Sequence, residues 1–77
     1  MPTLSQAVVD KRLSNGTIRM YCYLRQWQRA ETVPQMGEAI GMGGRHAYRC
    51  ITQLWEAGYI RIEYDPDDRR KRRYVVL

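Results

Sequence analysis

Side chains able to bind an anion or a nucleobase edge gather near the middle of the chain. They share one face of a helix predicted over about residues 44–57, and they are Arg45, His46, Tyr48, Arg49 and Thr52. Arginine presents a planar fork of donors that suits a phosphate or the edge of a guanine. One helix fits the major groove of DNA. This face therefore indicates contact with double-stranded DNA, and a plain solvated helix face is the alternative.

A second group of cations follows in the segment DPDDRRKRR, residues 65–73. Its proline and aspartates favour a turn, so we expect an exposed loop of mixed charge. The cations in it that we expect to contact DNA are Arg69, Arg70, Lys71 and Arg72. An ordinary solvated loop is again the alternative.

Length and charge limit the class of protein. The chain has 77 residues, enough for one domain with one small core. Lys and Arg number 13 against 8 Asp and Glu, and only Lys11 and Lys71 are lysines. This bias towards arginine suits a nucleic-acid partner, although composition alone does not separate that interpretation from a solubilising surface.

The sequence indicates no metal, cofactor or catalytic site. Cys22 and Cys50 lie on apolar faces of predicted helices, so we expect free thiols packed in the core. There is no CxxC pair and His46 is the one histidine, so we expect neither a disulfide nor zinc. No catalytic triad or phosphate loop is present, and we expect a protein that is not an enzyme.

The N-terminal segment does not resemble a targeting sequence. Residues 1–10 lack the basic start and continuous apolar run of a signal peptide, and no stretch reaches the length of an apolar membrane span. We therefore expect a cytoplasmic protein that makes no membrane contact. Residues 1–12 have a weak apolar pattern, which fits either a short helix or a mobile arm.

Three helices are predicted between this segment and the charged loop. The first covers about residues 15–29, where apolar side chains recur at helical spacing after residues suited to an N-cap. The second begins after Thr32 and ends at Gly41. We expect its buried stripe to be Met36, Ala39 and Ile40. The third, over residues 44–57, would bury Ala47, Cys50, Ile51 and Leu54 and end at Gly58.

Two β-prone runs flank the charged loop and predict a hairpin. They cover residues 59–64 and 74–77. The second and third helices, joined by a short glycine turn, fit a helix-turn-helix. The predicted fold class is therefore α+β, with three helices and a C-terminal two-stranded β-hairpin over residues 13–77.

Residues 13–77 resemble the bacterial winged helix-turn-helix regulators. MGEAIGM, residues 36–42, is similar to their second helix and glycine turn, and RCITQLWEAGYI, residues 49–60, is similar to the end of their recognition helix and the start of their wing. DPDDRRKRR resembles the wing of regulators of the multiple-antibiotic-resistance type. That resemblance implies a winged helix-turn-helix in which Asp68 orients Arg70 into the minor groove. Gly43 and Gly44 stand where the family often has Ser or Thr.

The resulting hypothesis is a sequence-specific double-stranded DNA-binding protein, a transcriptional regulator such as a repressor, of prokaryotic, phage or plasmid origin. A homodimer would match palindromic sites. A replication or recombination accessory factor would share the same DNA contacts. A protein-interaction module is the alternative from another class, with its contact surface formed by Trp55, Tyr59 and residues 1–12.

Overall fold

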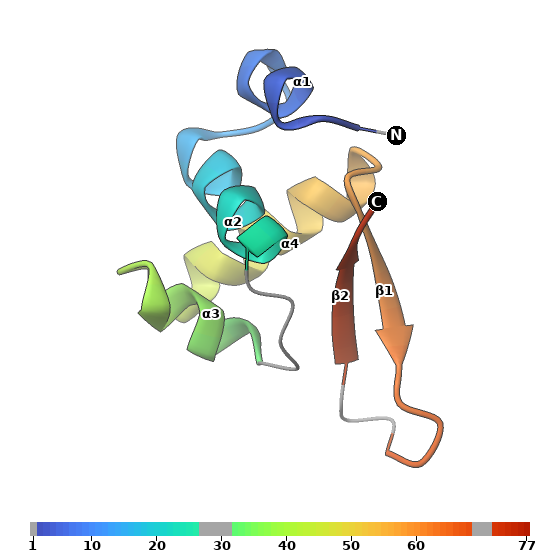
Figure 1. The fold of residues 1–77 in the computed structure, drawn as a ribbon. Coiled ribbons are helices and arrows are strands. Elements are labelled where there is room, and N and C mark those ends of the chain that lie inside the picture. The colour runs from blue at the N-terminus through green and yellow to red at the C-terminus, as the bar shows by residue number, and fades with distance from the viewer. Residues whose placement is uncertain (1, 27–31, 69–71) are drawn as a thin grey trace.

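The computed structural model describes residues 2–26, 32–68 and 72–77. These residues form four helices and an antiparallel hairpin (Figure 1). The elements are α1 (Leu4–Val9), α2 (Asn15–Gln26), α3 (Val33–Ala39), α4 (Gly44–Glu56), β1 (Ile60–Tyr64) and β2 (Arg72–Val76). The predicted end of the first helix, residues 27–29, lies outside the described residues.

The additional helix, α1, forms from the segment that fitted either a helix or an arm. It begins with a capping box, in which the Thr3 hydroxyl accepts from the backbone N–H of Gln6 and the Gln6 side chain accepts from the backbone N–H of Thr3. Ala7 is fully buried against the core, and α1 packs on α2. No helix in the described part of the chain is long and apolar enough to cross a membrane.

The core lies between α2, α3 and α4 and is closed on one side by the hairpin. The apolar stripe predicted for the third helix is confirmed, because Ala47, Cys50, Ile51 and Leu54 are all buried. The Tyr21 ring in α2 meets the Tyr59 ring edge to face, with 5.2 Å between their centroids.

Two core predictions are wrong. Ala39 is exposed, because the buried side of α3 is formed by Val33, Met36 and Gly37. Gly37 takes the place that faces α4, which turns Ala39 outward. Cys22 is only half-buried, whereas Cys50 is buried as expected.

The ends of α3 and α4 follow the predicted signals. Thr32 caps α3 in a capping box with Gln35, and Pro34 lies in the first turn. Gly41 and Gly58 follow α3 and α4 with φ of 70° and 83°, the left-handed conformation that favours glycine.

The hairpin is antiparallel, with Ile60 paired with Val76 and Tyr64 paired with Arg72. The predicted boundary of the second strand is wrong, because Arg72 and Arg73 belong to β2 and not to the loop. Cross-strand partners explain the difference. Arg73 stands opposite Glu63, and the Arg72 guanidinium lies 5.5 Å from the centroid of the Tyr64 ring.

Candidate nucleic-acid interface

Gly37 allows α3 to approach the start of α4 closely. A Cβ at this position would lie 2.8 Å from both the Ala47 Cβ and the Met42 carbonyl oxygen. The Gly37 carbonyl in turn accepts from the Met42 backbone N–H at 2.7 Å. The tight turn between α3 and α4 therefore depends on a residue without a side chain, and it sets the angle at which α4 leaves the core.

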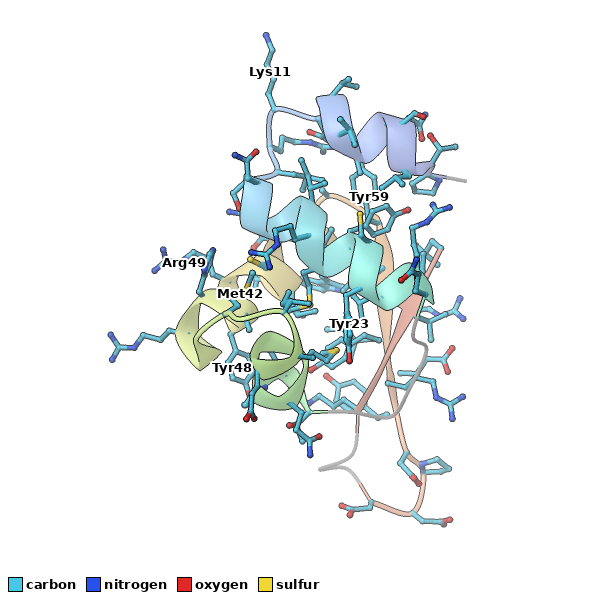
Figure 2. The ribbon with its side chains drawn as sticks, turned by 60° about the vertical axis from the view of Figure 1, so that its left-hand side comes forward. Lys11, Tyr23, Met42, Tyr48, Arg49 and Tyr59 are labelled. Carbon is cyan, nitrogen blue, oxygen red and sulfur yellow. The ribbon has the colours of Figure 1, made fainter. Side chains whose placement is uncertain are left out.

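The predicted contact residues of α4 lie on its exposed side. Arg45, Tyr48, Arg49 and Thr52 are all exposed, and Tyr48 keeps 51% of its surface accessible. Figure 2 shows Arg49 pointing away from the body of the molecule. The structure thus brings four of the five predicted residues together on one helix face; the fifth, His46, is also exposed but lies to one side.

The beginning of α4 has no side-chain cap. Gly43 is the N-cap residue, and no side chain accepts a hydrogen bond there. The first backbone N–H groups of a helix have no partner within the helix, and the helix dipole favours an anion at this end. Arg45 follows immediately, so the first turn of α4 carries a positive electrostatic potential.

His46 and Gln53 lie on the flank of α4 that faces α2. A Cβ on Gly16 would lie 2.8 Å from His46 Nε2, which shows that the imidazole rests against the first turn of α2. The Gln53 side-chain oxygen accepts from the Ser14 backbone N–H at 3.3 Å and from the Thr17 hydroxyl at 2.5 Å. Gln53 therefore holds two helices together.

Contacts within the protein separate the described arginines into two groups. Arg12 and Arg61 pair with Asp10 and Glu63, each at 2.7 Å. Three more engage other protein groups: Arg19 donates to the Ile40 carbonyl at 2.6 Å, Arg25 lies over the Tyr21 ring, and Arg72 lies over the Tyr64 ring.

The other group consists of Arg73, which stands opposite Glu63 in the hairpin, and of Arg45 and Arg49 in α4. The two arginines of α4 share its exposed face. Within residues 2–26, 32–68 and 72–77, neither side chain has a hydrogen bond or an ion pair. They stand four positions apart in α4, where two like charges destabilise a helix by about 0.2–0.5 kcal/mol. No acidic residue stands three or four positions from either of them. Their placement is therefore unfavourable for the isolated chain and suits an anionic partner.

The hairpin loop is partly described. The Asp65 carboxylate accepts from the Asp67 backbone N–H at 2.8 Å, which forms the turn that Asp and Pro favour. Asp68 is half-buried at the end of this turn. Arg69, Arg70 and Lys71 lie outside the described residues, so the pairing of Asp68 with Arg70 stays a prediction. Arg72 is exposed in β2.

The protein-partner surface predicted from the sequence is only partly present. Trp55 is 54% exposed, but Tyr59 is buried at 4%. The Tyr59 ring packs on Tyr21, and its hydroxyl donates to Asp10 at 2.9 Å. The prediction that Tyr59 is available to a partner is therefore wrong. Among the described residues, no three His, Cys, Asp or Glu side chains gather as metal ligands.

The residues that position α4 were not predicted from the sequence. Thr17 is fully buried and bonds both Ser14 and Gln53, a long-range contact without a local signal. Gly37 did leave a signal, because glycine is unfavourable inside a helix and its presence there points to a role in packing.

No protein-family model matches the sequence, and no curated protein matches it. Among solved structures, a point mutant of MepR from S. aureus matches with a TM-score of 0.73 and 18% sequence identity. The match covers 96% of this chain and 57% of that chain, so this chain spans little more than half of its length. The likeness shows that the chain has the winged helix-turn-helix fold, with α3 and α4 as the helix-turn-helix and β1 and β2 as the wing.

Proposed function

We propose that the protein binds double-stranded DNA sequence-specifically and acts as a transcriptional regulator, such as a repressor, in a prokaryote, phage or plasmid. In this proposal α4 enters the major groove and the hairpin lies beside it. One observation carries the proposal: Arg45 and Arg49 project from one exposed face of α4 without partners among the described residues.

The chemistry of this face fits duplex DNA. Arginine binds the O6 and N7 atoms of guanine in a bidentate manner, and it also binds phosphates. The uncapped start of α4 adds free N–H donors at the end of the helix that usually meets DNA. The net charge of +5 would add a general attraction to the phosphate backbone.

The hairpin would supply the second set of contacts. Arg69, Arg70, Lys71 and Arg72 would bind phosphates or the minor groove, whose negative potential attracts arginine where it is narrow. Asp68 would orient Arg70, as the resemblance of the wing implies. His46 would contribute least, because its ring already rests on Gly16.

A homodimer on a palindromic site is part of the proposal, because one helix-turn-helix reads only a few base pairs.

Of the two aromatic residues predicted to contact a protein partner, Trp55 is the one that is exposed, at 54%. It lies near the C-terminal end of α4, two helical turns beyond Tyr48.

Selection of bound sequences from a random duplex library tests this function. We expect one enriched motif, which is palindromic if a dimer binds. Arg45→Ala and Arg49→Ala should each weaken the free energy of binding to the enriched duplex by about 1–3 kcal/mol. Each should also relax specificity at the base pair that the side chain reads.

Lys11→Ala is the matched control, because it also removes one exposed positive charge. Figure 2 shows Lys11 pointing outward from the turn between α1 and α2, away from Arg49. Failure to enrich any sequence would refute sequence-specific binding. Equal losses in Lys11→Ala and Arg49→Ala would refute the role assigned to α4.

A further inference from the structure

The Thr52 side chain is fixed in an orientation that determines which of its groups faces outward. Thr52 lies within the exposed face of α4, and its hydroxyl donates to the Tyr48 carbonyl at 2.9 Å. A threonine hydroxyl has one hydrogen, so this bond leaves Thr52 with nothing to donate to a nucleobase. With Oγ1 directed back at the helix, the methyl is the other heavy-atom group on Cβ and the one left to project from the surface.

A methyl group has a specific counterpart in the major groove. Thymine exposes a 5-methyl group there, and apolar contact with it is one of the ways in which proteins recognise an A·T pair. Thr52 follows Arg49 by three positions, and residues three or four apart are neighbours on a helix surface. The exposed face of α4 therefore places an apolar contact directly beside a cationic one.

We infer that Thr52 is a specificity-determining residue that reads the 5-methyl group of a thymine in the major groove. This inference rests on the proposed binding of duplex DNA by α4. If so, the exposed face of α4 prefers a thymine next to the base pair or phosphate that Arg49 contacts.

The competing role for Thr52 is recognition through its oxygen. Oγ1 keeps two lone pairs and could accept from an adenine or cytosine amino group. Its bond to the Tyr48 carbonyl directs that oxygen towards the helix backbone. The methyl group is therefore the better placed of the two to contact a base. The two roles predict opposite behaviour for substitutions that keep only one of the two groups.

The test uses the duplex enriched from the random library, with each thymidine replaced in turn by 2′-deoxyuridine. This replacement removes the 5-methyl group and leaves base pairing intact. At one thymidine in each half-site, we expect the wild-type affinity to fall about fourfold, which corresponds to one apolar carbon group of about 0.8 kcal/mol.

Variants at Thr52 identify the group responsible. Thr52→Ser keeps the hydroxyl, and it should bind the thymidine and deoxyuridine duplexes equally at that position. Thr52→Val keeps the methyl, and it should preserve the fourfold difference. Arg49→Ala should weaken binding to both duplexes while leaving their affinity ratio above one.

The inference is overturned if no deoxyuridine replacement changes wild-type affinity, or if Thr52→Ser keeps the difference while Thr52→Val loses it. Both outcomes require a duplex that the wild-type protein binds. They are therefore distinguishable from failure of the proposed function, in which no duplex is enriched.

Discussion

Gly37 controls the distance between α3 and α4 because its missing side chain leaves room for the Met42 carbonyl and the Ala47 methyl. Alanine is the better helix former by about 1 kcal/mol, but crowding in a packed core costs about 1–3 kcal/mol. We therefore predict that Gly37→Ala lowers the free energy of unfolding, measured by urea denaturation.

Gly16→Ala is the control for this prediction. A Cβ there would meet the ends of the His46 and Met42 side chains, which can turn aside, whereas at Gly37 it would meet a backbone oxygen. We expect the stability of Gly16→Ala to stay within about 1 kcal/mol of wild type. Equal stability of Gly37→Ala and the wild type would contradict the role of Gly37.

Asp10 links the end of α1 to the start of the hairpin. Its carboxylate accepts from the Arg12 side chain, from the Arg12 backbone N–H and from the Tyr59 hydroxyl. These hydrogen bonds, chiefly those from Arg12, hold the pKa of Asp10 well below its ordinary value. Because the folded state binds this proton more weakly, Asp10 stabilises the fold above the unfolded-state pKa of about 3.9.

That stabilisation is lost as the pH falls through the lowered pKa of the folded state. We predict that Asp10→Asn lowers the melting temperature at pH 6 and that the difference from wild type narrows towards pH 2. Melting curves across this range measure the effect. A difference that stays constant or widens on acidification would show that the Asp10 charge does not contribute in this way.

At the scale of elements, the helix boundaries could be predicted because their signals are local. Thr32 and Gln35 form the capping box of α3, and Gly41 and Gly58 adopt the positive φ that ends α3 and α4. Each signal acts within one helical turn. A single sequence therefore contains the information needed to place these ends.

The start of β2 could not be predicted in the same way. Arg72 and Arg73 look like part of the charged loop, and they join the strand because Tyr64 and Glu63 stand opposite them. Gln53 shows the same limit, since its partner Thr17 lies 36 positions away. Contacts of this kind depend on the packing of distant elements, which local spacing does not encode.

Substitutions at Gln53 test how α2 and α4 are held together. Gln53→Ala would remove the acceptor that bonds the buried Thr17 hydroxyl and the Ser14 backbone N–H. Losing a hydrogen-bond partner in a buried site costs about 1–3 kcal/mol. We predict a loss of that size in urea denaturation. Gln53→Glu, which keeps an acceptor oxygen, should retain more stability than Gln53→Ala, and the reverse order would contradict this role.

At the scale of the whole molecule, the distribution of charge matters more than its total. The spacing in the sequence predicts that Arg45 and Arg49 share one helix face. It could not show that Arg12 and Arg61 form ion pairs within the protein, or that Arg19 donates to a backbone carbonyl. That distinction depends on the tertiary fold, and it selects α4 as the candidate interface. The contributions of residues 69–71 remain predictions from the sequence.

The binding of duplex DNA by this face is tested most directly by the salt dependence of affinity for the enriched duplex. The wild-type logarithm of affinity should fall linearly with the logarithm of salt concentration, with a slope of about −0.9 for each phosphate neutralised. At fixed salt, the double variant Arg45→Ala/Arg49→Ala should bind at least about tenfold more weakly than Lys11→Ala. An affinity that does not change with salt concentration, or a double variant that binds as tightly as Lys11→Ala, would contradict the account.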